Sequence, residues 1–131
     1  MMPASDELPL NYLPRLPIRR DFRIGCIGAG FIMRDCHLVA YRQAGFNPIA
    51  IASRNIDNAR AVAQQHHIPR VHNTVDELLA DTDIEVLDIA VPPDVQPGLI
   101  RKALTHSKHI KGILAQKPLA LNTRQAKDLV D

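Results

Sequence analysis

The sequence predicts an α/β fold built on a doubly wound parallel sheet. Strand-like apolar runs alternate with helix-like amphipathic segments, and the loops between them are short. This alternation is typical of right-handed βαβ crossovers, which produce parallel sheets. Residues 85–91 are also mostly apolar, as expected of a parallel strand that is buried on both faces.

Each element has its own local signals. Gly45 ends the first helix, Thr74 and Glu77 have the spacing of a capping box, and Asp94 is placed to cap the helix after Pro92-Pro93. We expect strands at 22–27, 47–53, 70–72, 85–91 and 112–116. We expect helices at about 30–44, 56–67, 74–80, 94–106 and 122–130.

Composition excludes several classes of protein. The chain has 131 residues, 46% of them apolar, which is enough for one domain with a core. A net charge of +2 is too small to indicate nucleic-acid binding. Apolar runs fall short of the roughly 20 residues of a membrane span, and the N-terminus lacks a signal-peptide core. Cys26 and Cys36 form no disulfide or metal-ligand pattern, so we expect a cytoplasmic protein without a metal site.

Residues 1–20 are expected to form an extended N-terminal arm, and residues 21–131 the folded domain. Four prolines interrupt the arm, and it has no periodic pattern. Two interpretations remain open. The arm is a solvated tail, or its apolar residues pack on a partner subunit; these residues are Leu10, Tyr12, Leu13 and Leu16.

The most informative motif is a glycine turn between the first strand and the first helix. Gly28 permits a tight bend, and Gly30 lets bare backbone approach a pyrophosphate at the start of the helix. Met33 stands where a dinucleotide-binding turn has its third small residue, and we expect it to widen the contact between helix and strand. The turn predicts a Rossmann-like NAD(P)-binding domain.

The end of the second strand favours NADP(H) over NAD(H). NAD-binding domains commonly place an acidic residue there for the ribose 2′-hydroxyl, but this chain has Ser53 and Arg54. Both can bind a 2′-phosphate. NAD(H) remains an alternative, because Arg54 can be a plain surface residue and Asp57 lies close enough in sequence to bind a ribose.

Two more motifs follow strands. Val91, Pro92 and Pro93 can form a rigid shelf along the nicotinamide ribose, or can simply end the fourth strand. Lys117 follows the fifth strand, where a cation can orient a substrate hydroxyl and stabilise oxyanion charge. Alternatively, Lys117 is an exposed lysine.

Together these residues resemble the N-terminal domain of the Gfo/Idh/MocA (glucose–fructose oxidoreductase / inositol dehydrogenase) family. The resemblance runs from about Phe22 to the C-terminus and implies an NAD(P)-dependent oxidoreductase acting on sugars or polyols. Lys117 resembles the lysine of the family's Glu-Lys-Pro motif, although Gln116 replaces the glutamate and Gln96 stands where a histidine is common. The markers are Gly28-x-Gly30-x-Ile32, His37, Ser53-Arg54, Val91-Pro92-Pro93, Ala103-Leu104 and Gln116-Lys117-Pro118.

The resulting predictions are a catalytic Lys117 and a set of cofactor-binding residues. That set is Gly28, Gly30, Phe31, Ile32, Ser53, Arg54, Val91, Pro92, Pro93 and Gln116. The resemblance also implies a second α/β domain with an Asp-x-x-x-His pair, which is absent from this sequence. We therefore expect a truncated chain that binds cofactor without turnover, and a full-length protein that acts on a small molecule and forms a homo-oligomer.

Other readings of the sequence stay open. A non-catalytic Rossmann-like module that binds a nucleotide or assembles with a partner has the same glycine turn. A different doubly wound fold, such as a flavodoxin-like domain, is a weaker alternative.

Overall fold

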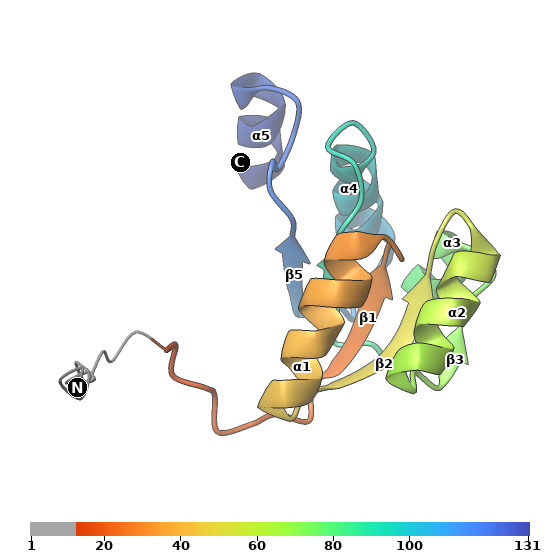
Figure 1. The fold of residues 1–131 in the computed structure, drawn as a ribbon. Coiled ribbons are helices and arrows are strands. Elements are labelled where there is room, and N and C mark those ends of the chain that lie inside the picture. The colour runs from red at the N-terminus through yellow and green to blue at the C-terminus, as the bar shows by residue number, and fades with distance from the viewer. Residues whose placement is uncertain (1–12) are drawn as a thin grey trace, which may run out of the picture.

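The computed structural model describes residues 13–131 and contains one five-stranded sheet with helices around it (Figure 1). All strand pairs are parallel, and the strand order is β3-β2-β1-β4-β5. The chain moves outward from β1 to β3 and then crosses back to β4. This reversal confirms the predicted doubly wound sheet. The strands are β1 (Arg23–Ile27), β2 (Asn47–Ala52), β3 (Arg70–Val71), β4 (Val86–Ile89) and β5 (Gly112–Ala115).

A helical segment follows each strand, with one departure from the expected geometry. The segment after the glycine turn begins as a π-helix, η1 (Ile32–His37), and continues directly as α1 (Leu38–Ala44). The predicted helix is therefore in place, but it is not α-helical throughout. The other helices are α2 (Ile56–His66), α3 (Val75–Ala80), α4 (Gln96–His106) and α5 (Thr123–Val130).

Both faces of the sheet are covered by apolar side chains. On one face, Met33 and Leu38 of the first helical segment and Val62 of α2 are buried against the sheet. On the other face, Leu78 of α3 and Ile100 of α4 are buried in a second cluster. α5 lies beside α4 at the β5 edge and buries none of its own residues (Figure 1).

The expected helix signals hold at two positions. Gly45 has φ 80° and ends α1 in the left-handed conformation. At the start of α3, Thr74 Oγ1 accepts a hydrogen bond from the backbone N–H of Glu77 (3.1 Å). Glu77 reaches back to the N–H of Asn73 (3.0 Å) instead of the cap residue itself, which is a variant of the predicted capping box.

The prediction that Asp94 caps α4 is wrong. The N-cap of α4 is Val95, and no side chain caps this end of the helix. The backbone N–H groups of Val95 and Gln96 both donate to the carbonyl oxygen of Pro92 (3.0 and 3.1 Å), and Pro97 has no N–H. The donors that Asp94 would satisfy are therefore already paired or missing.

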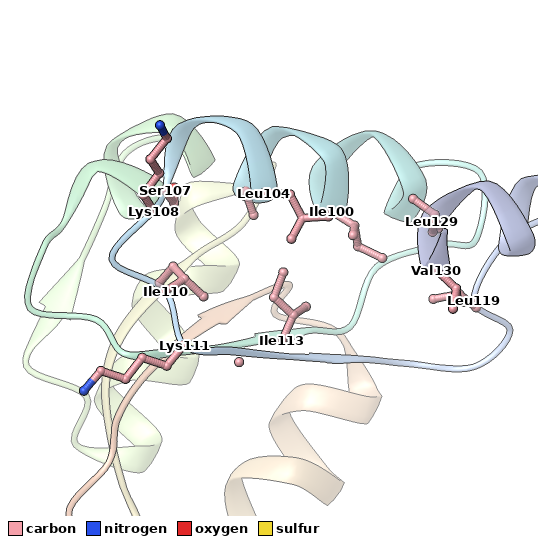
Figure 2. A pocket seen from close by; sticks show the side chains of 12 residues that line it. Ile100, Leu104, Ser107, Lys108, Ile110, Lys111, Ile113, Leu119, Leu129 and Val130 are labelled. Atoms are coloured by element: carbon pink, nitrogen blue, oxygen red, sulfur yellow. The ribbon is translucent and has the colours of Figure 1, made fainter.

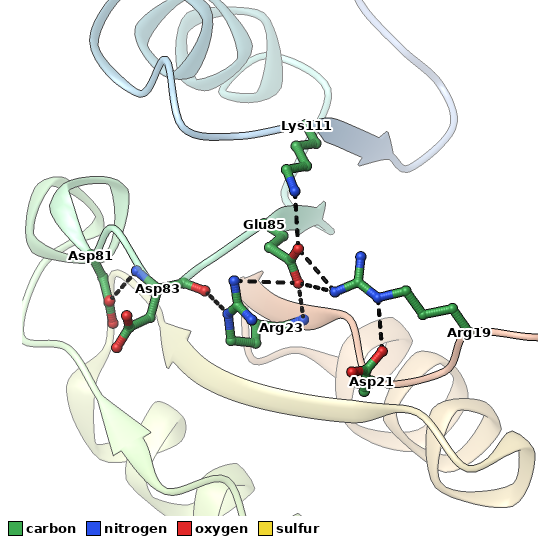
Figure 3. Close-up of polar contacts among 7 residues, drawn as sticks. All are labelled: Arg19, Asp21, Arg23, Asp81, Asp83, Glu85 and Lys111. Carbon is green, nitrogen blue, oxygen red and sulfur yellow. Dashed lines mark hydrogen bonds and ion pairs between the residues drawn. The ribbon is translucent and has the colours of Figure 1, made fainter.

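The segment before β1 is attached to the domain by a buried carboxylate (Figure 3). Glu85 has a side chain only 5% exposed, and its two oxygens accept hydrogen bonds from one guanidinium nitrogen of Arg19 at 2.9 and 3.0 Å. The backbone N–H of Arg23 (3.2 Å) and the ammonium of Lys111 (3.3 Å) also contact this carboxylate. Arg19 further stacks on the ring of Phe22, 4.3 Å from its centroid.

The two apolar arm residues that the structure describes remain exposed. Leu13 and Leu16 are 71% and 45% exposed, and residues 13–22 contain no helix or strand. Leu10 and Tyr12 lie outside the described residues. Within residues 13–131, no helix is both long enough and apolar enough to cross a membrane.

Candidate functional site

A cavity lies at the point where the strand order reverses, and its walls include residues that follow β1, β2, β3 and β4. Its volume is about 540 Å³. Open α/β sheets bind ligands at such a reversal, beyond the carboxyl ends of the strands. The lining residues are Ile27, Gly28, Ala29, Gly30, Ser53, Arg54, Asn55, Asn58, Asn73, Thr74, Val75, Ala90, Val91, Pro92, Val95 and Leu99.

Gly28 occupies a position that no other residue type fits. Its φ is 109°, and a Cβ atom added there would lie 2.3 Å from the carbonyl oxygen of Ala90. Its N–H donates to the carbonyl oxygen of Ala52 (2.9 Å). The turn is therefore held between the ends of β2 and β4, as the sequence-based role of a tight bend requires.

Gly30 differs from Gly28, because a Cβ atom there would meet nothing within 4 Å. The space above Gly30 is open, and the chain continues at once into the helix, with Arg34 N–H donating to its carbonyl oxygen (2.9 Å). Phe31 and Ile32, also predicted to bind cofactor, do not line the cavity. Their side chains are 63% and 36% exposed.

The helix beyond the turn is fixed from below by a polar cluster that sequence reasoning missed. Asp88 of β4 is fully buried, and its carboxylate lies 2.8 and 3.0 Å from Nδ1 of His37. The hydroxyl of Tyr41 donates to the same carboxylate (2.5 Å). The sequence does contain a signal for this cluster, because an aspartate within an apolar strand needs hydrogen-bond partners when it is buried. Met33 is fully buried in the same region.

The residues after β2 form a turn whose side chains face the cavity. Ser53 Oγ accepts from the N–H of Asn55 (3.2 Å), which leaves its hydroxyl proton available to donate. Asn55 caps α2 by accepting from the N–H groups of Asp57 and Asn58 (3.0 and 3.2 Å). Arg54 is exposed and lines the cavity.

The charges around this cavity favour an anion. In the described part of the chain, its lining includes Arg54 but neither aspartate nor glutamate. Asp57, the residue considered for a ribose, is 87% exposed and lies 3.6 Å from Arg60, outside the lining. An anionic group entering beside Arg54 therefore meets no opposing carboxylate in the cavity wall.

Some predicted residues are brought together and others are not. Val91 and Pro92 line the cavity, whereas Pro93 does not. Gln116 and Lys117 also stay outside the lining, although β5 ends at the same sheet edge and Ala115 pairs with Ile89. The lining residues missed from the sequence lie at or near the starts of α2, α3 and α4, and include Asn55, Asn58, Asn73, Thr74, Val75, Val95 and Leu99.

A second cavity of about 540 Å³ lies between α4, β5 and α5 (Figure 2). Its walls are mainly apolar and include Ile100, Leu104 and Ile113. The ammonium groups of Lys108 and Lys111 point away from it (Figure 2). It has no glycine turn and its cations face outward, so it lacks the features that the cavity beside Gly28 offers to an anion.

Comparison with known proteins agrees with this geometry. The sequence profile of the "oxidoreductase family, NAD-binding Rossmann fold" matches residues 22–131. The uncharacterized oxidoreductase ORF334 of Rhizobium meliloti is 36% identical over 110 residues, which cover 83% of this chain and 32% of the relative.

Two solved structures have the same fold. The myo-inositol dehydrogenase of Lactobacillus casei, in complex with NAD(H) and myo-inositol, superposes with a TM-score of 0.75 at 26% identity, over 85% of this chain and 32% of that one. The 3-ketoreductase KijD10 of Actinomadura kijaniata, in complex with TDP-benzene and NADP, gives 0.73 at 29% identity, over 84% and 34%. This chain spans about a third of the length of the relatives it matches. It belongs to the Gfo/Idh/MocA oxidoreductase family, and residues 22–131 match the NAD-binding Rossmann domain of that family.

Proposed function

We propose that this chain is the cofactor-binding domain of an NAD(P)-dependent oxidoreductase. In the full-length protein, hydride moves to or from the hydroxyl-bearing carbon of a sugar or polyol. The observation that carries the proposal is the cavity at the strand reversal, where the turns after β1, β2 and β4 meet. The polyol bound to the similar inositol dehydrogenase supports the substrate class.

The residues present fit a dinucleotide. The open space above Gly30 leaves room for a pyrophosphate, and the backbone amides of Phe31 and Ile32 begin the helix there. Val91 and Pro92, which line the cavity, form the proposed shelf for the nicotinamide ribose, and Pro93 and Gln116 lie outside the lining beyond the ends of β4 and β5. The nicotinamide, when bound, supplies the hydride acceptor or donor.

NADP(H) is the preferred cofactor in this proposal. Arg54 can pair with a 2′-phosphate, the Ser53 hydroxyl can donate to it, and no carboxylate in the cavity wall opposes it. A charge-assisted hydrogen bond of this kind contributes roughly 1.5–3 kcal/mol, or about a tenfold to hundredfold preference. One of the similar structures binds NADP and the other binds NAD(H), so the shared fold does not decide between the two cofactors. The proposed preference therefore rests on Ser53 and Arg54.

Lys117 is the proposed catalytic residue. It is exposed after β5, and no ion pair between residues 13 and 131 involves it. Its ammonium group can therefore bind a substrate hydroxyl and stabilise the oxyanion that forms when a base takes the hydroxyl proton or, in the reverse direction, when hydride adds to the carbonyl carbon. The partner acid–base group and most substrate contacts belong to the full-length protein in this proposal.

Calorimetric titration of the folded chain with NADPH and NADH tests the cofactor assignment. We expect heat from both, with NADPH bound about tenfold more tightly. A folded protein that gives no heat with either nucleotide would overturn the proposal. In the full-length enzyme, Lys117→Ala should lower kcat for a polyol far more than it changes NADPH affinity.

A further inference from the structure

A buried glutamine lies directly beneath the segment that carries Lys117. Gln96 is the first residue of α4 and is 0% exposed. Its Nε2 donates to the carbonyl oxygen of Gln116 (2.6 Å) and also contacts those of Pro118 (3.3 Å) and Leu119 (3.2 Å). Since only the amino half of a carboxamide donates, these three acceptors determine how the side chain is oriented.

These contacts lie on both sides of Lys117. The segment from Gln116 to Leu119 forms neither helix nor strand, so its carbonyl groups need partners from elsewhere in the fold. Gln96 provides them from a neighbouring element. The backbone on each side of Lys117 is therefore fixed, while the lysine side chain itself stays exposed.

The carbonyl oxygen of the Gln96 side chain, Oε1, makes an amide at this position costly for stability. This oxygen is buried and has no hydrogen-bond partner among the described residues. A buried oxygen without a partner destabilises a fold, and an apolar side chain of similar length would avoid that cost. Pro97 and Ile100 on the same helix are buried already. The contacts of the amino half therefore account for the amide.

We propose that Gln96 is a positioning residue for Lys117, one that couples the lysine segment to the wall of the cofactor cavity. Pro92 and Val95 line that cavity, and the backbone N–H of Gln96 donates to the Pro92 carbonyl (3.1 Å). Gln96 thus holds the cavity wall through its backbone and the lysine segment through its side chain. This inference rests on the proposed function, in which Lys117 acts at the nicotinamide end.

The test follows Lys117 by NMR after reductive methylation of the lysines with carbon-13. Comparison with Lys117→Arg identifies its signal, and saturating NADPH is then added to the 131-residue chain. We expect the Lys117 signal of the wild type to shift. Gln96→Met keeps the side-chain length without a donor, and should lose most of the shift while NADPH affinity changes by less than about threefold.

Two variants serve as controls. Gln96→His retains an N–H donor and should restore the shift. Gln125→Met removes another glutamine bonded to this loop, whose Oε1 accepts from the N–H of Leu121 (3.2 Å), and should leave the shift unchanged.

The outcomes separate the two proposals. A Gln96→Met variant with the full wild-type shift overturns the positioning role and leaves the proposed function intact. A wild type that binds NADPH without any Lys117 response overturns both the positioning role and the catalytic role of Lys117. A wild type that binds no NADPH overturns the cofactor proposal and, with it, this inference.

A measurement on the wild type keeps the test valid if Gln96→Met does not fold. The side-chain amide protons of Gln96 should exchange slowly with water, because they are buried and bonded to backbone carbonyls. Fast exchange of both protons in the folded chain would overturn the positioning role.

Discussion

Nδ1 of His37 lies 2.8 Å from Oδ2 of Asp88, and this contact joins the π-helical segment after the glycine turn to β4, a strand inside the sheet between β1 and β5. Asp88 is fully buried, and Tyr41 donates to the same oxygen. Burial and the neighbouring carboxylate raise the pKa of Tyr41, so its phenol remains protonated and continues to donate. The helical segment that follows the glycine turn is thus anchored in the sheet.

Asp88→Ala should therefore destabilise the domain strongly. It removes the buried acceptor of two partly buried donors, His37 and Tyr41, and hydrogen bonds to a charged group contribute about 1.5–3 kcal/mol each. We expect the free energy of unfolding in urea to fall by about 3 kcal/mol or more. Asp88→Asn keeps an acceptor oxygen and should lose less.

Asp128→Ala is the matched control, since Asp128 is exposed on α5. It should change the stability by no more than about 0.5 kcal/mol. Equal losses for Asp88→Ala and Asp128→Ala would contradict the anchoring role of Asp88.

The carboxylate of Glu85 should make the stability depend on acid pH. The backbone N–H of Arg23, the Arg19 guanidinium and the Lys111 ammonium hold its pKa at about 2, below the ordinary 4.5. Because the folded pKa is the lower one, the stabilisation is complete above pH 4.5 and is lost as pH falls toward 2.

Urea unfolding of the wild type and of Glu85→Gln at several pH values measures this effect. Neighbouring contacts also lower the pKa values of Asp35 and Asp81, so the difference between the two proteins isolates Glu85. The wild type should lose more stability than the variant between about pH 5 and pH 3. Parallel pH dependences would show that the Glu85 contacts do not persist in solution.

The two glycines of the turn should respond differently to alanine. Gly28→Ala places a Cβ 2.3 Å from the Ala90 carbonyl oxygen at a φ of 109°, and should cost about 2 kcal/mol or more of stability. Gly30→Ala meets no atom within 4 Å, so it should fold normally.

NADPH binding to the Gly30→Ala variant tests whether Gly30 faces the bound cofactor. If pyrophosphate approaches the bare backbone of Gly30, Gly30→Ala should weaken NADPH binding by about tenfold with an unchanged melting temperature. Unchanged affinity in this variant would place the pyrophosphate elsewhere.

Features that depend on local pattern could be predicted from the sequence. The order of strands and helices follows from apolar periodicity, and the ends of α1 and α3 follow from Gly45 and Thr74. The turn at Gly28 was predictable because a tight strand-to-helix bend needs a residue that tolerates positive φ.

Features that depend on contacts between distant segments could not be predicted. The partners of Asp88 lie 47 and 51 residues away in the sequence, and the sheet order brings them together. Asn73 and Thr74 reach the cavity because β3 lies beside β2. The prediction that Asp94 caps α4 is wrong for a similar reason. The carbonyl oxygen of Pro92 accepts from the first N–H groups of this helix, and the sequence does not reveal where a backbone carbonyl points.

Arg54 should determine the choice of cofactor. It is the one charged residue in the described lining of the cavity, so Arg54→Ala should weaken NADPH binding by about tenfold to a hundredfold and leave NADH binding nearly unchanged. Calorimetry with both nucleotides measures the ratio of the two affinities.

Ser53→Asp, which adds a carboxylate where a 2′-phosphate would lie, should shift the preference further toward NADH by repulsion. Arg101→Ala, a change at an exposed arginine of α4 outside the lining, should alter neither affinity. Equal losses of NADPH and NADH affinity in Arg54→Ala would mean that Arg54 contacts a group common to both nucleotides, and the NADP(H) preference would have to be abandoned.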